Sequence, residues 1–212
     1  MSVPSSYDPA DPIGVIFWEE GGGSSTDPLV TEMRHNEDFD MNYEENGNTK
    51  SYVFPAAKEK YIVISGVAPR GQLLLQYGMP ALHANRWAGP ATYEYLKAMY
   101  DEVAQNYNLD PNDVHLAGFS MGGNGAYYAA VKFGDWFGKI MASAGSPQIF
   151  EPKLFLNNLV TLIHGTNDAY FNSTSDCRQH FTPVEGARLA YDLLHAVNPL
   201  SVLAEYPGHH GR

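Results

Sequence analysis

The chain has a single cysteine, Cys177, among its 212 residues. An intrachain disulfide needs two cysteines and a cysteine-based zinc site needs more, so both are excluded. The eight histidines show no helical i, i+3 or i, i+4 pair beside a third ligand, so a histidine metal centre is not expected either. Cys177 is therefore interpreted as a packed or surface thiol.

Basic charge is scarce. Lys and Arg together number 13, against 24 Asp and Glu, which gives a formal net charge of -11. Such a surface repels the phosphates of nucleic acids and anionic lipid headgroups. We therefore expect no nucleic-acid partner and no membrane association.

Long apolar runs are also lacking. The first twelve residues, MSVPSSYDPADP, carry prolines and aspartates where a secretory signal needs an apolar stretch, and no later run reaches membrane-spanning length. The expected location is the cytoplasm, unless a secretory leader has been trimmed from this sequence. With no repeat or low-complexity tract, the length predicts one domain over residues 1–212, and it leaves open whether the protein is a monomer or a homodimer.

Short apolar runs bounded by turn residues are present instead. Most are apolar at successive positions, which is typical of strands buried on both faces in a parallel sheet. Helical periodicities separate them, so the predicted class is α/β. The expected strands are 13–18, 61–67, 113–119, 139–145, 158–165 and 201–206, and the expected helices are roughly 92–107, 121–133 and 184–197.

The stretch from Thr31 to Lys60 fits neither pattern. It is rich in acidic residues around Asn46-Gly47-Asn48. We interpret it as a solvated surface excursion. A cation site is the alternative, but its acids lack a recognisable ligand spacing such as that of an EF-hand.

Gly118-Phe119-Ser120-Met121-Gly122 joins an expected strand to an expected helix. Ser120 therefore falls at a sharp turn, which is the setting of a nucleophile elbow, and glycines at 118 and 122 avoid side-chain collisions there. Such a turn exposes the serine hydroxyl and aims the backbone N–H of Met121 at a reacting carbonyl, while the helix N-terminus favours an oxyanion. The alternative is a tight turn without chemistry.

A serine nucleophile needs a base to take its proton and an acid to orient that base. Asp168 follows a strand-length apolar run and is the favoured acid; Asp176, in a less anchored loop, is the alternative. His209 and His210 follow the last apolar run, and one of them is the candidate base. Gly208 leaves room for the ring of His209, which favours that residue.

Three segments, GFSMGGNGA (118–126), HGTND (164–168) and EYPGHH (205–210), together resemble the α/β-hydrolase superfamily. Within it they are similar to the esterase group of polyhydroxybutyrate-depolymerase-like, feruloyl-esterase-like and esterase-D-like enzymes and related predicted peptidases. The resemblance implies a three-layer αβα sandwich with a reduced, mostly parallel sheet of about six strands in the order 2-1-3-4-5-6. It also implies acyl transfer from a small-molecule ester to water, without cofactor or metal.

The chain departs from that group in the loop that supplies the second oxyanion donor. The group has a strand ending in His-Gly, whereas here Glu19-Glu20 precede three glycines. Gly21, Gly22 or the next glycine can still give a backbone N–H, although a flexible loop is the alternative. Because carboxylates facing the oxyanion would oppose it, we expect Glu19 and Glu20 to point away. Two further departures are the missing antiparallel strand pair before Ile13 and the missing aromatic residue after the histidines.

Aromatic residues near the expected loops are candidates for the pocket wall, with ordinary core or surface positions as the alternative. The predicted function is a serine esterase for a small or carbohydrate-linked acyl ester. A serine peptidase with the same triad and an inactive hydrolase fold used for binding are the alternatives. The candidate wall residues are Phe17, Trp18, Trp87, Tyr170 and Phe171.

Overall fold

A six-stranded parallel sheet organises the chain in the computed structural model, which describes residues 1–19, 42–45, 48–51, 55–66, 92–145, 158–168 and 183–208. The strand order is β4-β1-β5-β6-β7-β8, and every neighbouring pair is parallel. This confirms the predicted order 2-1-3-4-5-6. The strands are β1 (Ile13–Glu19), β4 (Ile62–Gly66), β5 (Leu109–Phe119), β6 (Lys139–Ser143), β7 (Leu159–Gly165) and β8 (Val202–Tyr206).

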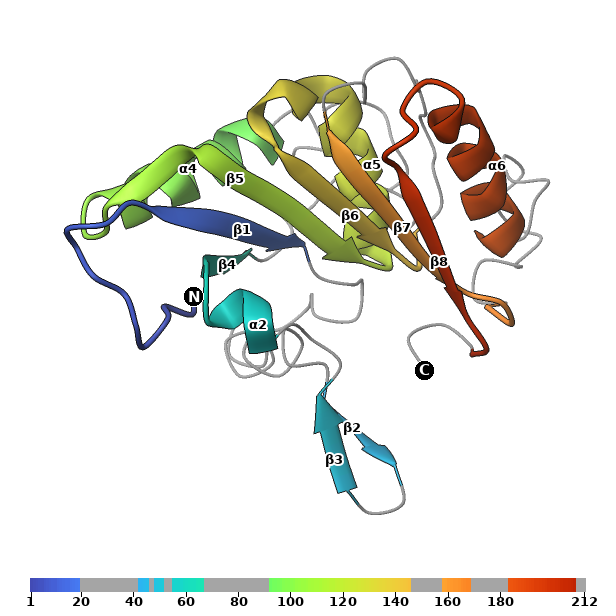
Figure 1. Ribbon diagram of the computed structural model, residues 1–212, viewed down its shortest axis with the longest axis horizontal. Helices are drawn as coiled ribbons and strands as arrows, with labels where there is room; N and C mark the ends of the chain where they lie inside the picture. Colours follow the sequence, from blue (N-terminus) through green and yellow to red (C-terminus); the bar gives the residue numbers. More distant parts are fainter. Residues whose placement is uncertain are drawn as a thin grey trace, which may run out of the picture.

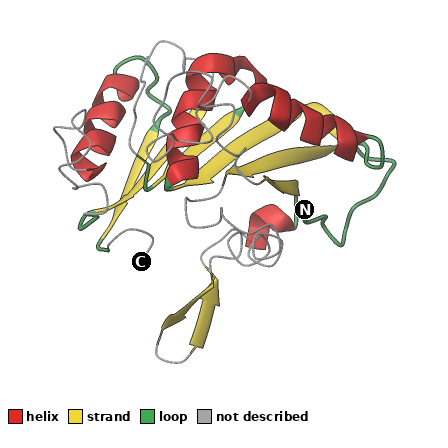
Figure 2. Ribbon diagram, turned by 180° about the vertical axis from the view of Figure 1, so that it is seen from behind, coloured by secondary structure: helices red, strands yellow, loops and turns green. Residues whose placement is uncertain are grey.

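Three long helices cover one face of this sheet (Figures 1 and 2). They are α4 (Thr92–Ala104), α5 (Met121–Phe133) and α6 (Pro183–His195), close to the predicted ranges, and α6 begins at the proline expected in its first turn. The short helix α2 (Pro55–Lys58) lies on the opposite face, where Ala57 lines a cavity together with Ile16 and His115. Among the described residues, no helix is long and apolar enough to cross a membrane.

Alternation along β1 shows how both sheet faces are buried. Val15 and Phe17 belong to the main core under the helices, whereas Trp18 packs with Val63 and Ala117 on the other face. The apolar stripe predicted for α4 is confirmed, because Leu96 is 1% exposed in the same main core. The unbroken apolar runs in the sequence reflect this two-sided burial.

Strand β5 is longer than predicted and begins at Leu109. Ile13 pairs with Leu109, but Val15 pairs with Val114, so the register shifts between these two pairs. The extra residues of β5 contain Pro111, and the backbone N–H of Asn112 donates a hydrogen bond of 2.8 Å to the Asp110 side chain. The turn-forming sequence before Asp113 concealed this first part of the strand.

A small antiparallel hairpin, β2 (Asn42–Glu45) and β3 (Asn48–Ser51), lies within the stretch interpreted as a surface excursion. The sequence interpretation missed it. Asn-Gly between two paired segments is a strong hairpin signal, and here Asn46-Gly47 stands between the strands. The acidic composition favours a solvated loop, whereas that dipeptide favours a hairpin.

The N-terminal arm packs along the edge strand β4. Ser2 and Val63 exchange two backbone hydrogen bonds of 2.9 Å in an antiparallel bridge. Further along, the Tyr7 hydroxyl accepts a hydrogen bond of 2.8 Å from the N–H of Asn108. In the part of the chain that the structure describes, this single bridge stands where the family has an antiparallel strand pair.

Candidate active site

Ser120 stands alone between the end of β5 and the start of α5. Its backbone has φ 56° and ψ -113°, and it is one of two described non-glycine residues with positive φ. Such a conformation costs on the order of 1–3 kcal/mol and persists only where the surrounding structure enforces it. The strain of a nucleophile elbow, inferred from the sequence, is therefore present at this serine.

Close backbone packing explains the glycines around the turn. A Cβ on Gly118 would lie 2.2 Å from the carbonyl oxygen of Gly122, and a Cβ on Gly122 would lie 1.8 Å from the carbonyl oxygen of Glu19. Neither neighbour is a flexible side-chain end that could move away. The turn is further fixed by the Ser120 N–H, which donates to the Ser143 carbonyl at 2.9 Å.

Helix α5 begins at Met121, so the backbone N–H of Met121 is in the first turn, where N–H groups have no partner within the helix. The Ser120 side chain makes no capping hydrogen bond to this turn. An oxygen anion beside Ser120 would thus meet free N–H groups and the positive end of the helix dipole. The role of Met121 as an oxyanion donor stays a prediction.

Asp168 lies three residues beyond β7 and is 3% exposed. Its carboxyl oxygen Oδ2 is 3.1 Å from Nε2 of His164, which is itself 1% exposed. This contact places His164 against the candidate acid of its own loop. Asp168 is thus held in a buried position by a side chain from the same strand-loop unit.

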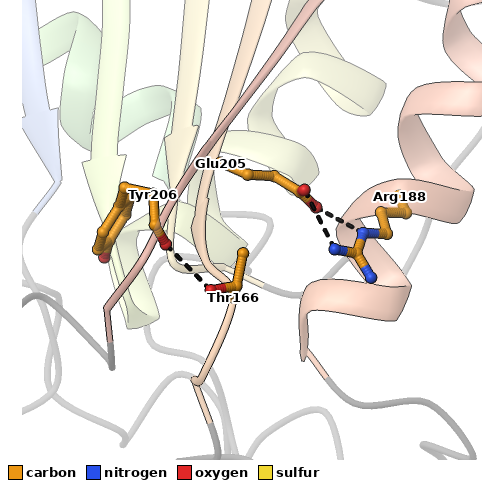
Figure 3. A network of polar contacts seen from close by, with 4 residues as sticks. All are labelled: Thr166, Arg188, Glu205 and Tyr206. Atoms are coloured by element: carbon orange, nitrogen blue, oxygen red, sulfur yellow. Dashed lines mark hydrogen bonds and ion pairs between the residues drawn. The ribbon is translucent and has the colours of Figure 1, made fainter.

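The loop that carries Asp168 is tied to the end of β8. The N–H of Thr166 donates to the Tyr206 carbonyl at 3.0 Å, and the N–H of Asn167 donates to the Gly208 carbonyl at 2.9 Å. The Thr166 hydroxyl also donates to the Tyr206 carbonyl, at 3.3 Å, as Figure 3 shows. Since His209 follows Gly208 in the chain, the acid loop is bonded to the residue just before the candidate base.

An ion pair between α6 and β8 supports this end of the sheet. The Arg188 guanidinium donates two hydrogen bonds to the Glu205 carboxylate (Figure 3). These bonds hold the pKa of the Glu205 carboxyl below its usual range. Because the pair is solvent-exposed, its contribution to the free energy of unfolding is small.

The burial of Glu19 differs from what the sequence led us to expect. It was expected to turn away from the oxyanion as a charged group, but it is completely buried. Burial raises the pKa of its carboxyl well above 4.5. Burial therefore disfavours the charged form of this side chain and weakens the repulsion on which that expectation depended.

Two candidates for the pocket wall have core positions. Trp18 is 3% exposed and Phe17 is 0% exposed, and each belongs to a buried apolar cluster. Their packing does not support a place in the pocket wall. The other site predictions lie outside the described residues: Glu20, Gly21, Gly22, Gly23, Trp87, Tyr170, Phe171, Asp176, His209 and His210.

The sequence profile of the Esterase family, described as "Putative esterase", matches residues 1–179. The chain belongs to the Esterase family. This confirms the resemblance that the three motifs suggested. The esterase chain is 28% identical over 182 residues to a bifunctional acetylxylan esterase/xylanase from Neocallimastix patriciarum. The match covers 85% of the chain and 24% of that protein, so the chain spans about a quarter of the length of this relative.

Solved structures similar to this esterase share its fold at low sequence identity. A thermostable esterase has a TM-score of 0.69 at 16% identity, covering 97% of this chain and 49% of its own. A ferulic acid esterase from Anaeromyces mucronatus has a TM-score of 0.59 at 16% identity, and the match covers 98% of this chain and 76% of that esterase. A fluorophosphonate-binding serine hydrolase from Staphylococcus aureus has a TM-score of 0.56 at 18% identity, and the match covers 98% of this chain and 83% of that hydrolase. The fold is thus that of an α/β-hydrolase.

Proposed function

We propose that this protein is a serine esterase that cleaves a small or carbohydrate-linked carboxylic ester through an acyl-enzyme. The observation that carries the proposal is the strained backbone of Ser120 at the β5–α5 turn in a member of the Esterase family. A nucleophile elbow keeps this strain to present its hydroxyl, which supports the assignment of Ser120 as the nucleophile.

In the proposed reaction the Ser120 hydroxyl attacks the ester carbonyl carbon. His209, or His210 in the alternative assignment, takes the hydroxyl proton and passes it to the leaving alcohol, and Asp168 orients the imidazole. The oxygen anion that forms accepts hydrogen bonds from the N–H of Met121 and of a residue in the Gly21–Gly22 pair. Water then attacks the acyl group with the same histidine as base, which releases the carboxylic acid.

Two observations support this assignment of the acid and the base. Asp168 is buried and held by His164, as a group that must keep a fixed orientation requires. Its loop is hydrogen-bonded to Gly208, which limits the distance between Asp168 and a base at position 209. The alternative acid, Asp176, lies outside the described residues.

A fluorophosphonate probe tests the nucleophile. We expect wild type to be labelled and Ser120→Ala to be unlabelled. Ser143→Ala is the matched control, since Ser143 ends the adjacent strand and contacts Ser120 through its backbone carbonyl, which the substitution keeps. Absence of wild-type labelling, or equal labelling of Ser120→Ala, overturns the proposal and favours a binding role for the fold.

Steady-state hydrolysis tests the base and the substrate class. We expect Ser120→Ala and one of His209→Ala and His210→Ala to lose at least about 10⁴-fold in kcat on p-nitrophenyl esters. Full activity of both histidine variants contradicts the triad. Acetylated xylan, methyl ferulate and a blocked peptide in parallel assays separate a carbohydrate esterase from a peptidase. The first two substrates follow the activities of the relatives named above.

A further inference from the structure

Glu19 occupies a space with no neighbouring side chains in the sheet. Its partners in the two adjacent strands are both glycines, Gly66 in β4 and Gly118 in β5. Gly122, in the first turn of α5, lies directly over it, because a Cβ on Gly122 would be 2.9 Å from the Cβ of Glu19. Three glycines therefore surround a glutamate that is 0% exposed.

The carboxyl group of Glu19 has no described partner. Among the described residues, neither of its oxygens has a hydrogen bond, and no ion pair reaches it. Alternation along β1 puts Glu19 on the same face as Val15 and Phe17, which lie in the core under α4 and α5. A fully buried carboxyl without a partner is costly and is usually tied to a specific role.

The position of Glu19 connects it to both sides of the proposed reaction centre. On one side it contacts the first turn of α5, which holds Met121. On the other side it is followed in sequence by Glu20 and by the glycines proposed as the second oxyanion donor. Its partner Gly118 is two residues before Ser120.

We propose that Glu19 is a positioning residue for acyl transfer at Ser120. Its side chain fills the space between β1 and the first turn of α5 and so fixes the position of the turn that carries Met121. This inference rests on the proposed esterase function. An ionised carboxyl in this space would lack both water and a partner, so ionisation displaces the turn and adds negative charge near the developing oxyanion.

Within the described strands and helix that pack against Glu19, few titratable groups are present. The last three residues of β4 and of β5 contain no titratable acid or base. The titratable residues of α5, which are Tyr127, Tyr128 and Lys132, all lie five or more positions beyond Gly122. Burial is the cause of the raised pKa of Glu19.

The test is the pH dependence of kcat and KM for p-nitrophenyl acetate in wild type, Glu19→Gln and Glu19→Ala. Glu19→Gln keeps the volume and cannot ionise, so its kcat is expected to stay within about threefold of wild type near neutral pH. As pH rises, the ratio of its kcat to that of wild type is expected to increase, by up to about tenfold per pH unit. Glu19→Ala is expected to lose roughly tenfold to hundredfold in kcat with KM little changed.

Glu94→Gln, an exposed glutamate on α4, is the matched control and is expected to follow wild type at every pH. A constant ratio between Glu19→Gln and wild type across the pH range, or wild-type kcat in Glu19→Ala, overturns the proposal for Glu19 alone. A wild type that turns over no ester and is not labelled at Ser120 overturns the proposed function, and the role of Glu19 falls with it.

Discussion

The backbone N–H of Asn167 donates a hydrogen bond of 2.9 Å to the carbonyl of Gly208. These residues are 41 positions apart in the sequence, yet each is adjacent to a predicted member of the triad, Asp168 and His209. The bond joins two loops at the same edge of the sheet, so it links the loop of the predicted acid to the residue just before the predicted base. Main-chain hydrogen bonds and the hydrogen bond from the Thr166 hydroxyl together hold these loops side by side.

Removing that donor tests the coupling. Asn167→Pro deletes the N–H, and we expect kcat to fall by roughly tenfold to hundredfold because the acid and the base lose their fixed separation. Asn167→Ala keeps the N–H and is the control. Esterase kinetics of the two variants provide the measurement, and equal kcat values in both would show that the bond does not position the site.

Alanine at Gly122 tests the packing of the elbow. A Cβ there overlaps the carbonyl of Glu19, so we expect Gly122→Ala to lower the free energy of unfolding by about 3 kcal/mol or more. Gly138→Ala is the control, since its nearest contact would be 3.4 Å from the His115 ring, and its effect should not exceed about 1 kcal/mol. Urea unfolding measures both, and similar losses in the two variants would contradict the packing argument.

His164 is expected to matter through Asp168. Removing the His164 ring takes this contact away from the buried Asp168 carboxyl, so His164→Ala should lower the free energy of unfolding by about 1 to 3 kcal/mol. The double variant with Asp168→Ala should show an interaction energy of about 1 to 3 kcal/mol between the two positions. His195 on α6 is the control. It is exposed, stacks on Tyr191 and contacts the Ser201 hydroxyl, so its replacement by alanine should lower the free energy of unfolding by no more than about 1 kcal/mol. Additive losses at 164 and 168 would argue against a direct contact.

Burial of Glu19 predicts a pH-dependent stability. Its folded-state pKa lies above the unfolded value near 4.5, so folded protein keeps a proton that unfolded protein releases above that pH. Stability therefore falls as pH rises from 4.5 toward the folded-state pKa, by up to about 1.4 kcal/mol per pH unit, and is fully retained below 4.5. The Glu19→Gln variant lacks this titration. We would measure the free energy of unfolding of both proteins in urea between about pH 5 and about pH 8. The stability of the variant relative to wild type should rise with pH. A constant difference between the two proteins would mean that Glu19 does not titrate in this range.

Much of the fold could be predicted from residue patterns because two-sided burial and helical periodicity are local properties. The predicted bounds of α5, 121–133, agree with the structure, since the glycines before it and Gly134 after it mark its ends. The β2–β3 hairpin was missed because its acidic composition outweighed the Asn46-Gly47 signal. The first part of β5 was missed because its pairing with Ile13 depends on a register shift that no local pattern encodes.

The sequence by itself determined where the strands lie and where the turn that holds Ser120 falls, because residue type and spacing carry these directly. The strand order followed from the resemblance of its motifs to an esterase group. Only the tertiary structure decided the environments of buried polar groups. It placed Glu19 beneath the first turn of α5 and His164 in contact with Asp168. It also placed Trp18 in a buried apolar cluster. Burial depends on residues that are distant in sequence, and it changes the charge of an acid or the exposure of an aromatic ring in ways that its own neighbours cannot reveal.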